Sequence, residues 1–83
     1  MKKKELPYYP VIDIAATGRN IHRLRLEKGY SVNELQNYLG LGCPQGIYHW
    51  QAGKSLPSVD NLYAVSRLWN VSMNDILVEK KNA

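Results

Sequence analysis

Apolar residues recur along this chain with the period of an α-helix rather than that of a strand. In the first such stretch, residues 14–28, the apolar stripe consists of Ala15, Gly18, Ile21 and Leu24. Spacings of three and four positions line up one side of a helix, and no segment shows the two-residue alternation of a strand. The pattern therefore predicts an all-α protein. Similar stripes further along the chain bring the number of predicted helices to five.

Helix-capping residues predict where these helices begin and end. Asp13 stands at the N-cap position of the first helix, and Gly29 stands just after its last residue. Ser31 and Ser72 are each followed three positions later by an acidic residue, which is the spacing of a capping box, and Ser58 follows a proline. The later helices are therefore predicted at residues 32–39, 43–52, 59–69 and 73–78.

The helix predicted at residues 43–52 has two chemically distinct sides. We expect Cys43 to cap it as a small buried residue and Pro44 to occupy its first position, where a missing N–H costs little. Ile47 and Trp50 share the apolar side with Cys43. The opposite side carries Gln45, Tyr48, His49 and Ala52. One side can therefore be buried while the other contacts a partner.

Two short helices joined by a glycine-containing turn predict a specific arrangement. The helices at 32–39 and 43–52 are connected through Gly40, Leu41 and Gly42, and another helix braces them. This is typical of a helix-turn-helix, which places its second helix in the major groove of DNA. We expect it to form one compact domain at residues 13–78.

The segments on either side of this domain differ from it in composition. Residues 1–12 are predicted to form a basic arm, because Pro7 and Pro10 prevent a continuous helix there. Residues 79–83 are predicted to be a flexible tail. Lys and Arg number 11 against 7 Asp and Glu, a net charge of +4, and many of the lysines lie in these two segments. The excess favours a polyanionic partner, although solubility alone would also explain it.

Several functional classes find no support in the sequence. The single cysteine excludes an intrachain disulfide and a paired-thiolate metal site, so we expect a cytoplasmic protein without a metal or cofactor. No apolar run approaches the roughly 18 residues of a membrane span. His22 and His49 are 27 positions apart, and no nucleophile or carboxylate constellation accompanies either. Neither an enzyme nor a small-molecule substrate is predicted.

The polar side of the helix at 43–52 provides candidate contacts to DNA bases. Gln45 can form two hydrogen bonds with adenine, and it lies in the first turn, where base contacts usually begin. His49 lies one turn further on, and Tyr48 can reach a thymine methyl group or a phosphate. Ordinary solvent exposure is the alternative for each of the three.

Five further residues are candidate contacts to DNA phosphates. Lys54 follows the helix directly, and Ser31 and Ser58 begin helices whose free N–H groups favour anions. Arg19 and His22 lie on the outer side of the first helix and can contact the flanking backbone. Helix capping alone would explain both serines, and a solvated surface would explain the other three.

The order and spacing of these segments closely resemble the lambda-repressor-like helix-turn-helix family, also called the xenobiotic-response-element family of bacterial and phage regulators. The resemblance is carried by IHRLRLEKGYS, NELQNYLGL, IYHWQAGKSLPS and NLYAVSRLWNVSMNDIL. It implies five helices and a transcriptional regulator, most simply a repressor, that binds specific double-stranded DNA. A single module buries limited surface, so we expect a homodimer on paired half-sites.

Three positions depart from the pattern of the family. The family more often has seven steps where this chain has eight between Leu39 and Ile47, so the turn is expected to be one residue longer. Gln51 replaces an acidic residue that in the family pairs with an arginine matching Arg25, so we predict a neutral amide hydrogen bond instead of an ion pair. Gly46 within the helix at 43–52 would permit close approach of backbone.

A rival hypothesis keeps the helical scaffold but changes the partner. The helix at 43–52 contains no lysine or arginine. This weak basicity favours an antitoxin-like or adaptor protein that binds another polypeptide. The two hypotheses differ in the salt dependence of duplex binding, which is steep only for a DNA-binding protein.

Overall fold

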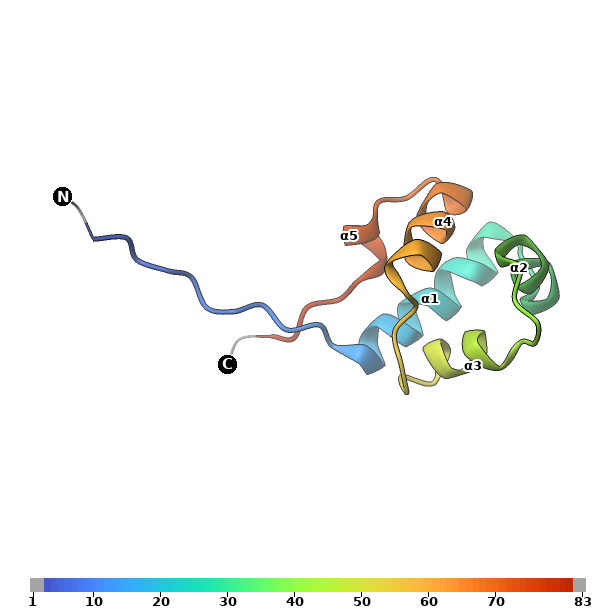
Figure 1. Ribbon diagram of the computed structural model, residues 1–83, viewed down its shortest axis with the longest axis horizontal. Coiled ribbons are helices and arrows are strands. Elements are labelled where there is room, and N and C mark those ends of the chain that lie inside the picture. The colour runs from blue at the N-terminus through green and yellow to red at the C-terminus, as the bar shows by residue number, and fades with distance from the viewer. Residues whose placement is uncertain (1–2, 82–83) are drawn as a thin grey trace.

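The computed structural model describes residues 3–81, which form a small helical body and a long extended arm (Figure 1). The arm makes the described chain 55 Å long, whereas its other two dimensions are 23 Å. The helices are α1 (Ile14–Lys28), α2 (Val32–Leu39), α3 (Gln45–Gln51), α4 (Val59–Trp69) and α5 (Met73–Ile76). The predicted all-α class and the number of helices are confirmed.

Most helix ends lie where the capping residues predicted them. The side chains of Asp13, Ser31, Ser58 and Ser72 each accept a hydrogen bond from a backbone N–H three residues later. Both predicted capping boxes are present, at the starts of α2 and α5. Gly29 and Gly40 follow α1 and α2 with φ of 81° and 68°, a backbone conformation that glycine adopts at little cost.

The start of α3 differs from the prediction. The first helical hydrogen bond runs from the Tyr48 N–H to the Pro44 carbonyl, 3.2 Å, so Pro44 is the N-cap and the helix spans Gln45–Gln51 rather than 43–52. Cys43 therefore lies outside the helix and is exposed, and the prediction of a small buried cap was wrong. No side chain caps α3, because a proline at this position has no group that can accept the bond.

The last helix is also shorter than predicted. α5 ends at Ile76 instead of residue 78, because the backbone of Leu77 is already extended, with ψ of 138°. Thr17 holds the segment that follows, since its hydroxyl accepts a 2.9 Å hydrogen bond from the Val78 N–H. Thr17 is fully buried, whereas Ala15 of the predicted apolar stripe is exposed. The side of α1 that carries Thr17 therefore contacts the C-terminal segment through a hydrogen bond rather than through apolar packing.

The core lies around α1, which packs against α3, α4 and α5 and runs between them in Figure 1. Trp69 is 1% exposed and contributes the largest fully buried side chain. Its indole N–H has no hydrogen-bond partner within the described chain. The other buried apolar residues are Ile21, Leu24, Leu35, Ile47, Trp50, Leu62, Val65 and Ile76.

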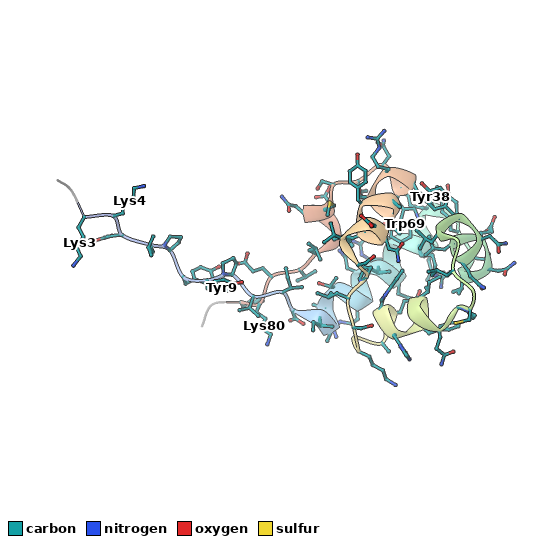
Figure 2. All side chains as sticks on the ribbon, viewed as in Figure 1. Lys3, Lys4, Tyr9, Tyr38, Trp69 and Lys80 are labelled. Carbon is teal, nitrogen blue, oxygen red and sulfur yellow. The ribbon has the colours of Figure 1, made fainter. Side chains whose placement is uncertain are left out.

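The arm and the C-terminal segment cross as a short antiparallel pair, which the sequence pattern did not predict. Ile12 lies opposite Glu79, and the Lys80 N–H donates to the Val11 carbonyl at 2.8 Å. The Tyr8 hydroxyl donates to the Glu79 carboxylate, which raises the pKa of Tyr8. Figure 2 shows Tyr9 and Lys80 at this crossing; Lys3 and Lys4 lie further out along the arm.

α1 and α3 lie very close together at Gly18, and this contact allows a stability test. A Cβ atom on Gly18 would overlap the Trp50 carbonyl oxygen and lie 2.9 Å from that of Gln51. Both obstacles are backbone atoms, so Gly18→Ala forces the helices apart. We expect it to lower the free energy of unfolding by about 1–3 kcal/mol, measured by urea denaturation.

Gly46 supplies the matched control for this substitution. It also lies in a helix, but a Cβ atom there would meet no atom of the chain within 4 Å. Gly46→Ala should therefore leave stability unchanged or raise it by up to about 1 kcal/mol. Equal effects of the two substitutions would contradict the close approach at Gly18.

Candidate nucleic-acid interface

α3 has one buried side and one outward side, as its sequence predicted. Ile47 and Trp50 are 0% and 6% exposed and join the core. Gln45 is exposed in the first turn, Tyr48 is half exposed, and His49 is partly buried. The amide, the phenol and the imidazole are therefore presented on the surface of the domain.

An open hollow of about 680 Å³ lies between α1 and α3. It brings together three residues that the sequence analysis assigned separately, namely Arg19 and His22 from α1 and Tyr48 from α3. Gln51 and Ala52 complete its lining. The sequence analysis did not assign Gln51 to the surface site. Its spacing of three residues from Tyr48 was the available signal, because residues three apart are neighbours on the surface of a helix. The other candidates, Gln45, His49, Ser31, Lys54 and Ser58, lie outside the hollow.

Beneath the hollow, Arg25 is buried and hydrogen bonded to neutral groups. Its Nε donates to Oε1 of Gln51 at 2.9 Å, which confirms the predicted amide bond in place of an ion pair. Its Nη1 donates to the Tyr30 carbonyl at 2.8 Å, and Nη2 lies 3.5 Å from Nδ1 of His22. Arg25 is 8% exposed, so α1 and α3 are joined here through a guanidinium that is almost out of contact with solvent.

Lys54 is exposed on the loop that follows α3. Its backbone N–H donates to the His49 carbonyl at 2.9 Å, which closes the last turn of the helix. The preceding Gly53 has φ of 74°, and a Cβ atom there would lie 2.8 Å from Cα of Ala15. The loop is therefore packed against the first turn of α1, and Lys54 projects from a fixed backbone.

Ser31 and Ser58 have structural roles as helix caps. Ser31 Oγ accepts from the Glu34 N–H at 3.0 Å, and the Ser31 N–H donates to the Glu34 carboxylate at 2.9 Å. The bond from the Ser31 backbone N–H to the charged carboxylate, with a smaller contribution from the Ser31 side chain, lowers the pKa of Glu34. Ser58 Oγ accepts from the Asn61 N–H at 3.2 Å. Capping accounts for both hydroxyls within the chain, and their contact with phosphate remains a prediction.

Residues 3–81 contain no group of three or more His, Cys, Asp or Glu side chains that could hold a metal ion. Among the helices described there, none is long and apolar enough to cross a membrane.

An amphipathic α3 that follows α2 through a short turn, with α1 packed behind it, is a helix-turn-helix domain. The family model described as helix-turn-helix matches residues 21–76, which is more than half of the chain. The chain therefore belongs to this family of DNA-binding transcription regulators, and the resemblance noted in the sequence is confirmed.

A comparison with solved structures agrees with this assignment. The chain is similar to the restriction-modification controller protein C.AhdI from Aeromonas hydrophila, with 20% sequence identity and a TM-score of 0.67. The match covers 77% of this chain and 96% of the controller protein's chain. It shows a shared fold. No curated protein matches the sequence.

The Arg25–Gln51 contact generates a prediction about stability. A carboxylate at the position of the amide would accept a charge-assisted hydrogen bond, which is usually the stronger kind. We expect Gln51→Glu to raise the free energy of unfolding by about 0.5–1.5 kcal/mol at pH 7, measured by thermal or urea denaturation.

The pH dependence of this gain has a defined sign. The partner guanidinium would lower the pKa of the new carboxyl in the folded state, so the gain is present above the pKa of the unfolded chain and is lost as the pH falls through the folded-state value. A clear drop in melting temperature at pH 7 would contradict the pairing.

Proposed function

We propose that this protein is a sequence-specific repressor that binds double-stranded DNA with α3 in the major groove. Gln45, Tyr48 and His49 contact base edges. Occupation of the operator blocks transcription. Arg19, His22, Ser31, Lys54 and Ser58 contact phosphates on either side of the groove and fix the orientation of the domain.

The observation that carries this proposal is the division of α3 into two sides. Ile47 and Trp50 fix the helix to the core, and Gln45 and Tyr48 on the other side are exposed. A helix held in this way presents its first turn to a groove without rearrangement of the domain. The net charge of +4 supports a polyanionic partner.

Two copies binding together would supply the affinity that one small domain lacks. A single helix-turn-helix module buries limited surface on DNA. We propose a homodimer on two half-sites whose centres are about 34 Å apart, one turn of the duplex. Selection from random oligonucleotides would give the operator sequence, its symmetry and its spacing in one experiment.

A salt titration with random-sequence duplex DNA tests DNA binding itself. Contacts to phosphates release counterions, so the affinity of the wild-type protein should fall steeply between 50 and 200 mM salt, by about 10-fold or more if several phosphates are contacted. Fluorescence anisotropy measures this directly. Absent or salt-independent binding would instead favour a protein-binding adaptor, which the lack of lysine and arginine in α3 would suit.

Gln45→Ala tests the role of α3 in sequence recognition. Loss of its two possible hydrogen bonds should cost about 1–3 kcal/mol on the selected operator and leave random-sequence binding nearly unchanged. Asn74→Ala is the matched control, because Asn74 is an exposed amide on α5. Equal losses on operator and random DNA would place Gln45 outside the base contacts.

A further inference from the structure

The described part of the arm, residues 3–12, has one hydrogen-bonding edge that the chain leaves open. On the other edge, the Val11 carbonyl and the Asp13 N–H bond to the C-terminal segment. Ile12 lies between these two positions, and in an antiparallel pair such a residue directs its own N–H and C=O away from the partner strand. Neither group of Ile12 has a partner within residues 3–81, so this edge can accept another strand.

The arm alternates its side chains as a strand does. The Tyr8 hydroxyl donates to the carboxylate of Glu79, which is the residue opposite Ile12. Tyr8 and Ile12 are four positions apart and therefore lie on the same side of the arm, as a two-residue period requires. The backbone of Asp13 is also extended, with φ of −84° and ψ of 102°, and Figure 1 shows the arm extended along its length. The open edge therefore continues through the even-numbered positions from Ile12 to Lys4.

The same segment exposes large apolar side chains. Leu6 and Tyr9 are 85% and 86% exposed, and about half of Tyr8 and of Val11 is exposed. Figure 2 shows Tyr9 away from the helical body. A pair of strands is marginally stable in water, whereas three or more strands that share an apolar surface can be stable. The arm therefore provides both the edge and the apolar surface that another strand would cover.

A second copy of the arm is the strand that fits this edge. Two identical antiparallel strands are related by a two-fold axis, so the donors on one edge face the same acceptors on the other. Pro7 is at an odd-numbered position, so its missing N–H belongs to the other edge, and Pro10 removes one donor from each strand. Antiparallel pairing also keeps Lys3 and Lys4 of the two copies at opposite ends, whereas parallel pairing would place these like charges side by side.

The charges select one register for this pairing. With Tyr8 on the two-fold axis, Lys3 of each copy lies opposite Asp13 of the other, and opposite charges at facing positions stabilise a strand pair. A shift that puts Tyr9 on the axis would instead place Glu5 opposite Asp13, which is a like-charge pair. The register centred on Tyr8 is therefore favoured.

We propose that two copies of this chain associate through their arms, paired antiparallel about Tyr8. The C-terminal segment of each copy then lies on an outer edge of the joined arms. Tyr9 of each copy packs on Pro7 of the other, and Leu6 packs on Pro10, so the exposed apolar side chains are covered. This inference rests on the homodimer of the proposed function and assigns the surface that forms it.

The length of the paired arms agrees with the proposed arrangement on DNA. Asp13 of one copy is separated from Asp13 of the other by ten residues of strand, which span about 34 Å. Half-sites one turn of the duplex apart have their centres at about the same distance. Arms paired in this register therefore hold the starts of the two α1 helices at a spacing compatible with such half-sites.

A disulfide test examines the register directly. Tyr8→Cys and Leu6→Cys are each made together with Cys43→Ser, because Cys43 is exposed and would react. On the two-fold axis the two Cα atoms at position 8 are about 5.5 Å apart, which a disulfide can span, whereas those at position 6 are about 14 Å apart, which it cannot. Under mild oxidation we expect a covalent dimer to form rapidly with Tyr8→Cys and much more slowly with Leu6→Cys. Equal rates would overturn the register.

Sedimentation equilibrium without DNA tests the interface itself, in a comparison of Tyr9→Ala with Tyr63→Ala. Tyr63 is the matched control because it is a half-exposed tyrosine on α4, in the helical body. Tyr9→Ala should raise the dimer Kd by about 10-fold, because the two-fold axis counts each lost cross-strand contact twice, and Tyr63→Ala should change it little.

Three results would overturn the proposal. A wild-type protein that stays monomeric would exclude the paired arms, and a dimer weakened only by Tyr63→Ala would place the interface on α4. If Tyr9→Ala left the dimer intact but weakened binding to duplex DNA, the arm would contact nucleic acid instead. A wild-type dimer that fails to bind duplex DNA would contradict the proposed function and leave the paired arms standing.

Discussion

The close approach of α1 and α3 at Gly18 is the constraint on which the rest of the structure depends. Because Gly18 has no side chain, the backbone carbonyls of Trp50 and Gln51 can lie against α1. Trp50 then enters the core, and Gln51 comes within hydrogen-bonding distance of Arg25. The outward side of α3 and the hollow beside it are both consequences of this contact.

The helices could be predicted largely from the sequence because their signals are local. The capping boxes at Ser31 and Ser72 and the glycines that end α1 and α2 depend only on neighbouring residues, and all lie where expected. The start of α3 was misplaced at Cys43, because neither Cys43 nor Pro44 provides a side-chain cap that would mark the first turn. Local patterns therefore specify a helix best where a side chain hydrogen bonds to its end.

The candidate site was only partly predictable, since it combines residues from two helices. The outward positions of Gln45 and Tyr48 follow from helical periodicity alone. The hollow does not, because it requires the distance between α1 and α3, and Gln51 in its lining is positioned by the hydrogen bond from Arg25. The amide bond to Gln51 was anticipated through the family resemblance, which supplied that long-range pairing.

The crossing of the arm with the C-terminal segment has a kinetic consequence. Tyr8 and Glu79 are separated by 71 positions, and Thr17 and Val78 by 61. Contacts between such distant positions close very large loops, at an entropic cost that short-range helix contacts avoid. The helices bring Ile12 and Glu79 together, so this crossing is expected to form late in refolding and to report the completion of the helical body.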